Sequence, residues 1–207
     1  MKMKNELLVG VASAAALIST ASAASAADVV APDDWSGLYA GVSVGSMFGD
    51  LPWANGSSTA GGHVYGLNSA AITPGGFVGF NSETSGGMVF GAELAAQFST
   101  PANIQGSSYQ YGLNNTIDAK ARLGFDAGQF MPYVFVGASS QSVAGEDAKT
   151  YAAYGVNFGV GVDVKVADHM TIGAEYIRRQ MSGFDALADK DVGFANNEIS
   201  LRAAYHF

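Results

Sequence analysis

The chain has 207 residues, no cysteine, 27 glycines and only 14% charged residues. Ordinary globular proteins carry about 25% charged residues and about 7% glycine, so this chain is rich in glycine and poor in charge. The absence of cysteine excludes disulfides and thiolate metal sites.

The first 26 residues have the pattern of a secretory signal peptide. Lys2 and Lys4 give a positive start, residues 7–18 are nearly all apolar, and two Ala-Ser-Ala triplets follow, the second ending at Ala26. This pattern predicts export and cleavage after Ala26, with an uncleaved membrane anchor as the alternative. Residues 27–34 would then form a short N-terminal segment, and 35–207 the folded domain.

Beyond Ala26 the chain has eight basic and seventeen acidic residues. No basic stripe is available to neutralise phosphates, so we expect no nucleic-acid partner.

From Trp35 onward, apolar residues alternate with polar or small ones. Ile117, Leu123 and Phe125 share one parity, while charged residues and glycine occupy the other; residues 154–164 repeat the pattern. A period of two over this length indicates strands with chemically different faces. We predict eight strands, at 36–48, 71–82, 87–99, 116–127, 131–142, 152–166, 169–182 and 194–207.

The connections between these strands alternate in length. Long ones cover 49–70, 100–115, 143–151 and 183–193, and short ones cover 83–86, 128–130 and 167–168. Long loops at one end and tight turns at the other are typical of outer-membrane barrels. The apolar residues are spread out rather than gathered into runs of 18, which argues against a helical membrane bundle.

Alternation by itself does not say which face is inside, and a soluble barrel would show the same period. Here the apolar series lacks charge except near strand ends, the polar series is full of glycine, and the apolar series continues to Phe207. These features predict an all-β, eight-stranded, antiparallel, transmembrane up-and-down β-barrel whose apolar series faces lipid.

The polar series then points five acids and four bases into a narrow interior. We predict that they form an ion-pair network, with Glu93 between Lys120 and Arg122, and Glu175 beside Arg202; a wet lumen with solvated charges is the alternative. The predicted interior charges are Glu93, Asp118, Lys120, Arg122, Asp163, Lys165, Glu175, Glu198 and Arg202.

Further residues are placed by their position along the strands. Arg178 and Arg179 are predicted at the outer rim, where guanidinium groups could hold lipopolysaccharide phosphates. Acidic residues of the long loops could share divalent cations, or could simply keep the loops soluble. Aromatic rings are predicted at the headgroup level of the tight-turn end, namely Trp35, Phe125, Tyr133, Tyr205 and Phe207.

Two patterns that resemble catalytic motifs are interpreted as structural. Gly41–Gly45 matches G-x-S-x-G, but a nucleophile elbow needs a turn into a helix, and here Ser43 sits within a strand. The three histidines, His63, His169 and His206, fall too far apart along the predicted barrel for a triad or a metal site. We therefore expect no catalytic site, no metal site and no cofactor.

Four stretches carry a resemblance to a known family: DWSGLYAGVSVG (34–45), ARLGFDAGQFMPYVFVGAS (121–139), NFGVGVDVKVADHMTIGAEYIRR (157–179) and ISLRAAYHF (199–207). The chain resembles the small outer-membrane β-barrel proteins of alphaproteobacteria, the porin-like major surface antigens. The resemblance implies eight antiparallel strands and an envelope-structural or surface role. It also implies that the terminal aromatics, Tyr205 and Phe207, are read by the barrel-assembly machinery.

These observations favour a barrel that works in envelope structure and surface contact, with outer-membrane lipid and lipopolysaccharide as its surroundings. A small diffusion pore is the first alternative. An adhesin that binds a surface ligand through loops 49–70 and 100–115 is compatible with either. A lipid-modifying enzyme would need a catalytic base that the sequence does not offer.

Overall fold

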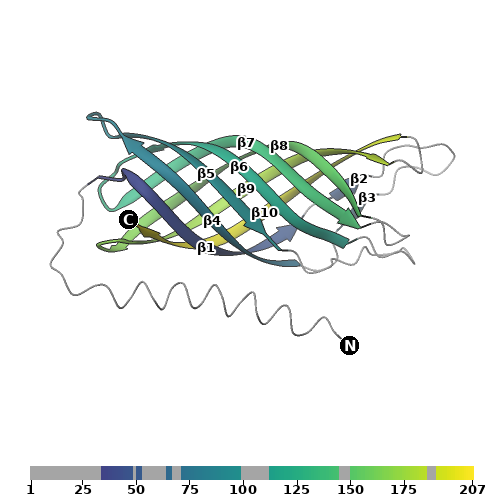
Figure 1. The fold of residues 1–207 in the computed structure, drawn as a ribbon, viewed down its shortest axis with the longest axis horizontal. Helices are drawn as coiled ribbons and strands as arrows, with labels where there is room; N and C mark the ends of the chain where they lie inside the picture. The colour runs from purple at the N-terminus through teal and green to yellow at the C-terminus, as the bar shows by residue number, and fades with distance from the viewer. Residues whose placement is uncertain are drawn as a thin grey trace.

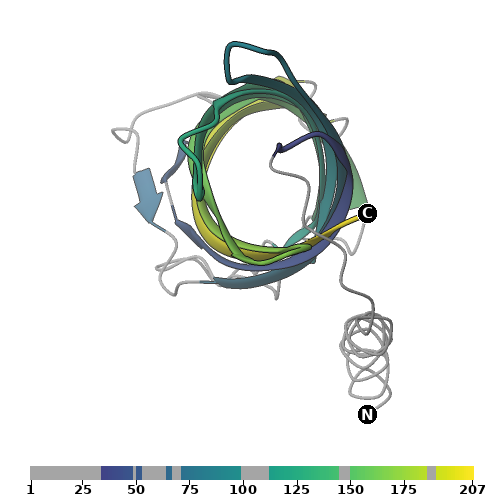
Figure 2. The same ribbon diagram turned by 90° about the vertical axis from the view of Figure 1, so that its left-hand side faces the viewer.

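The computed structural model describes residues 34–48, 50–52, 64–66, 71–98, 112–144, 150–185 and 190–207. Eight strands close into one antiparallel barrel in which each pairs with the next barrel strand along the chain, and β1 pairs with β10 (Figures 1 and 2). The eight-stranded antiparallel fold predicted from the sequence is thereby confirmed. The strands are β1 (Gly37–Phe48), β4 (Ala71–Glu83), β5 (Met88–Gln97), β6 (Gly112–Phe125), β7 (Phe130–Ala144), β8 (Thr150–Ala167), β9 (Met170–Asp185) and β10 (Lys190–His206).

A second, two-stranded sheet lies outside the barrel order. It pairs β2 (Asp50–Pro52) with β3 (Val64–Gly66), within the long connection between β1 and β4. In the part of the chain that the structure describes, no helix is long and apolar enough to cross a membrane.

The two faces of the barrel wall are chemically opposite. Ile117, Val160 and Leu201 point outward and are 51%, 53% and 64% exposed, whereas Asp118 and Arg202, on the other parity, are 0% and 6% exposed. A soluble barrel would place its apolar residues inside, so that alternative is wrong. A β-protein that spans a bilayer needs an apolar outer face and a closed ring of strands, so that the backbone groups of each strand are hydrogen-bonded to its neighbours.

Several strands extend further toward the long-loop end than the sequence pattern predicted. Only residues 145–149 separate β7 from β8, and only 186–189 separate β9 from β10. The predicted loops at 143–151 and 183–193 were therefore too long. Backbone pairing continues where the apolar–polar alternation has stopped, because ladder hydrogen bonds do not require an apolar face.

Two aromatic residues predicted at the membrane interface lie inside the barrel instead. Trp35 is 1% exposed and Tyr133 4% exposed, whereas Phe125 and Phe207 point outward as expected. Tyr133 points inward because it lies two residues from Met131 and from Phe135, which are the neighbouring inward residues of β7.

Candidate functional site

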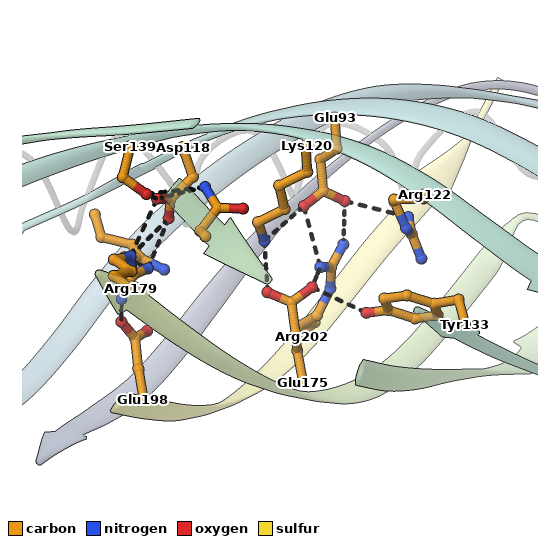
Figure 3. Close-up of polar contacts among 12 residues, drawn as sticks. Glu93, Asp118, Lys120, Arg122, Tyr133, Ser139, Glu175, Arg179, Glu198 and Arg202 are labelled. Carbon is orange, nitrogen blue, oxygen red and sulfur yellow. Dashed lines mark hydrogen bonds and ion pairs between the residues drawn. The ribbon is translucent and has the colours of Figure 1, made fainter. Parts of the chain in front are cut away.

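The buried charges inside the barrel form two groups (Figure 3). We call one the central cluster; its members are Glu93, Lys120, Arg122, Asp163, Glu175 and Arg202. The other, the loop-side cluster, lies nearer the long loops and consists of Asp118, Arg179 and Glu198. Both arise because inward positions recur every second residue, so that β6 alone contributes Asp118, Lys120 and Arg122 to one wall.

In the central cluster every charged group contacts at least two groups of opposite sign. Lys120 Nζ lies 3.2 Å from Glu93 Oε1 and also contacts Glu175. Arg122 Nη1 lies 3.2 Å from Glu93 Oε2, and its Nη2 lies 2.6 Å from Asp163 Oδ2. The direct cross-strand register of Glu93 with Lys120 sets this geometry.

Arg202 joins the acids of the central cluster to one another. Its guanidinium contacts Glu93 and Glu175, each at 2.5 Å, and its Nε lies 3.9 Å from Asp163. The pairs predicted from sequence, Glu93 with Lys120 and Arg122 and Glu175 with Arg202, are therefore all present in the structure. The six charges balance, three against three.

The loop-side cluster is built around Arg179. Its Nε and Nη2 donate to Asp118, with the shortest distance 2.6 Å, and its Nη1 donates to Glu198 Oε2 at 2.9 Å. Ser139 and Asn157 also donate to Asp118. All three charged side chains of the cluster are 0% exposed.

Two sequence-based assignments are corrected here. Arg179 was predicted at the outer rim beside Arg178, but it has the inward parity of Glu175 and lies inside. Lys165 was predicted inside, but it lies at the tight-turn mouth, where its Nζ is 4.5 Å from the centre of the Trp35 ring. Arg179 thus replaces Lys165 as the fourth buried base.

Aromatic rings and glycines support the central cluster in a way the sequence analysis missed. Tyr133 stands directly across from Gly161, and Phe77 across from Gly41. A Cβ on either glycine would collide with the facing ring, so the missing side chain makes the space that the ring fills. Arg122 in turn lies 3.9 Å from the centre of the Tyr133 ring, within cation–π distance.

The same arrangement recurs around Arg202 and Lys120. Arg202 lies 4.0 Å from the centre of the Phe77 ring, and Lys120 lies 4.8 Å from that of Phe135. Phe135 again stands opposite a glycine, Gly159. Aromatic residues and glycines both recur at inward positions, so the sequence contains a signal for this arrangement. Which ring faces which glycine depends on the register between the strands.

Trp35 lies at the tight-turn end of the barrel. Its indole Nε1 donates to Asp126 Oδ1 at 3.0 Å, and its backbone N–H donates to Glu83 Oε2 at 2.8 Å. It packs in a buried cluster that includes Val89 and Met131. Figure 2 looks onto this end and shows the purple start of the described chain within the outline of the ring.

Other candidate residues lie apart from these clusters. On the outer face, Arg178 Nη1 donates to Asn197 Oδ1 at 3.1 Å. Ser43 lies within β1, and His206 contacts Thr171 near the tight-turn end. Among the described residues, no group of three or more histidine, aspartate or glutamate side chains could hold a metal ion.

Some predicted features lie outside the described residues. Most of the loops 49–70 and 100–115 belong to this group, and so do His63 and Ala26. The side chains of the acidic loop residues proposed to share divalent cations are also not described.

Comparison with known proteins agrees with this architecture. The family described as "Outer membrane protein beta-barrel domain" matches residues 13–207. Neisserial surface protein A superimposes with a TM-score of 0.56 at 16% identity, over 83% of this chain and 98% of that one. Ail, the attachment invasion locus protein of Yersinia pestis, gives a TM-score of 0.49 at 13% identity, over 83% of this chain and 99% of that one.

No curated protein sequence matches the chain. The likeness to Neisserial surface protein A is too distant in sequence to carry more than the fold. The family match, however, spans nearly the whole chain. Together with the lipid-facing apolar wall, it shows that the chain belongs to the outer membrane protein β-barrel domain family.

Proposed function

We propose that this outer-membrane barrel has a structural role in envelope integrity and surface contact, with a lumen closed by its own salt bridges. The observation that carries the proposal is the burial of the central cluster. The side chains of Glu93, Lys120, Arg122, Glu175 and Arg202 are between 0% and 4% exposed, and Asp163 is 11% exposed.

An ion crossing this lumen would have to displace charged side chains that are already paired with one another. Arg202 is shared by three acids and packs against Phe77, so moving it would leave three buried acids to share the two remaining bases. Leaving buried charges unpaired costs about 3–5 kcal/mol. Trp35 supports the proposal as a second closure at the tight-turn mouth.

We propose no catalytic role. The G-x-S-x-G match lies in the middle of β1, where Ser43 pairs with Gly75 and Arg202 rather than standing on a turn. The partners that we propose are outer-membrane lipids and lipopolysaccharide, not nucleic acid, together with a surface ligand for loops 49–70 and 100–115. A closer kinship with the alphaproteobacterial surface antigens is proposed from the four sequence stretches alone.

The lipid partner is proposed to bind at Arg178. This residue lies on the outward parity of β9, where Phe158 is its cross-strand neighbour and Asn197 holds one of its guanidinium nitrogens. A cation on the lipid face is costly unless it reaches the headgroup region. A lipid phosphate there could accept hydrogen bonds from the remaining guanidinium N–H groups.

The conductance of the refolded protein in a planar bilayer tests the closed lumen. We expect the wild-type protein, shown to be folded by its heat-dependent gel shift, to give no current steps. Trp35→Ala alone should also be silent, because the central cluster remains. Combining Trp35→Ala with Glu93→Ser and Arg202→Ser removes both closures without changing the net charge, and should produce steps. Regular wild-type steps that change with Lys120→Ala would instead identify a diffusion pore.

A structural role also requires that the buried ion pairs stabilise the barrel. Arg179→Ala leaves Asp118 and Glu198 without their shared partner, so we expect the free energy of unfolding in detergent to fall by about 3–5 kcal/mol. The adjacent Arg178→Ala is the matched control, because it removes the same side chain from the outer face and should change stability by less than about 0.5 kcal/mol. Equal effects of the two variants would contradict the structural role of the network.

The rim proposal predicts a difference in lipid binding. Loss of a charge-assisted hydrogen bond costs roughly 1.5–3 kcal/mol, so Arg178→Ala should weaken lipopolysaccharide binding by about tenfold or more. Binding is measured as the lipopolysaccharide retained per folded barrel, with Gln180→Ala on the same face as the control. Unchanged retention in Arg178→Ala would refute the assignment.

Export and assembly are proposed to depend on the two ends of the chain. Cleavage after Ala26 predicts that protein isolated from outer membranes begins at Ala27, which N-terminal sequencing measures. Replacing Phe207 with Ser should slow assembly in cells, while the purified variant still refolds in detergent, because the residue is 74% exposed and its hydrogen bond to Leu38 is made by the backbone. Normal assembly of this variant would remove the proposed role of the terminal aromatic.

A further inference from the structure

The buried charges of the barrel interior do not cancel. Among the described residues, five acids and four bases of the two clusters are buried there. The central cluster is balanced, so the excess negative charge belongs to the loop-side cluster. There Asp118 and Glu198 share the single guanidinium of Arg179.

The surroundings of this cluster offer little solvent to hold an excess charge. The side chains of Asp118, Arg179 and Glu198 are 0% exposed. Nearby inward positions toward the loops hold uncharged residues that are themselves at most 1% exposed, namely Thr116, Gln141 and Asn196. A buried ion without a counter-ion costs several kcal/mol, and in practice such a group is neutralised by a proton.

The hydrogen bonds distinguish the two carboxyl groups. Asp118 accepts from two nitrogens of Arg179, from the Ser139 hydroxyl and from the Asn157 amide, which is a full set for an ionised carboxylate. Glu198 accepts from one nitrogen of Arg179, Nη1, on Oε2 at 2.9 Å. Its other oxygen, Oε1, accepts from the Thr73 hydroxyl at 3.1 Å, so Glu198 has fewer donors than Asp118.

The strand neighbours of Glu198 also disfavour a charge. In the register it lies directly opposite Met47 of β1 and Ile177 of β9, both 0% exposed. The charged groups that face it are Arg179 from β9 and Asp118 from β6. The contact from β4 is the Thr73 hydroxyl, which can accept a hydrogen bond as well as donate one.

We propose that Glu198 is a neutral carboxylic acid in the folded barrel, with its proton on Oε1 and the Thr73 hydroxyl rotated so that it accepts this proton. The loop-side cluster is then balanced, with one carboxylate against one guanidinium. The folded barrel retains a proton that the unfolded chain releases above acidic pH, so its stability should decrease as the pH rises. This inference rests on the buried contacts and does not depend on whether the lumen conducts.

Isosteric amide variants test the assignment at about pH 7. Glu198→Gln reproduces the neutral acid, with an amide that can donate to Thr73 and a carbonyl that can accept from Arg179. Its unfolding midpoint in denaturant should equal or exceed that of the wild type. Asp118→Asn removes the carboxylate that balances Arg179, and its midpoint should fall. Equal losses in the two variants would show that Glu198 is ionised.

The pH dependence gives a second readout. Unfolding releases this proton between about pH 5 and about pH 8. In that range the unfolding equilibrium constant of the wild type should increase by up to about tenfold for each unit that the pH rises. Glu198→Gln should lose this component, while Asp118→Asn keeps it. Infrared spectra of the folded wild type should contain the C=O band of a protonated carboxylic acid, absent from Glu198→Gln.

The infrared measurement on the wild type can overturn the proposal even if a variant fails to refold. Absence of the acid band at about pH 7 would overturn the proposal. Stability that rises with sodium or potassium concentration, without an acid band, would do the same, because a metal cation would then neutralise the cluster.

Discussion

A charged side chain inside a narrow barrel has lipid beyond the wall and little water within it, so it must find its counter-charge among the other interior side chains. This constraint shapes the interior of the protein. The outer face excludes charge along most of its length, and the inward parity therefore carries the acids and bases of the wall. Their mutual pairing joins strands far apart in the chain, such as β5 with β10 through Glu93 and Arg202.

The pairing depends on space as well as charge. Eight strands enclose an interior that side chains can fill, and the large residues here fit because glycines stand opposite them. Tyr133, Phe77 and Phe135 each occupy the volume that a facing glycine leaves free. The bases then lie on these rings while they contact the carboxylates. Glycine content, aromatic content and buried charge are thus parts of one arrangement.

The two clusters differ in how completely they satisfy this constraint. The central cluster is balanced and its members share several partners, so its charges are neutralised within the cluster. The loop-side cluster has one base for two acids and relies on hydroxyl and amide groups for the rest. Any response of the barrel interior to pH would therefore begin at Glu198 rather than at Glu93.

The strand number, the antiparallel order and the chemical identity of the two faces could be predicted from the sequence, because a side-chain period of two is a local property of the chain. It also placed eight of the nine predicted interior charges on the inward side. Arg179 points inward because it continues the parity of Glu175, whereas Lys165 and Trp35 lie together at the tight-turn mouth.

Most contacts between inward groups depend on how the strands are arranged around the barrel. Each aromatic ring faces a glycine, Arg179 joins Asp118 to Glu198, and Arg202 reaches Glu93 and Asp163 in addition to its predicted partner Glu175, because the strands are staggered and closed into a ring. A local pattern carries no information about the register between distant strands, which is why these contacts could not be predicted from the sequence.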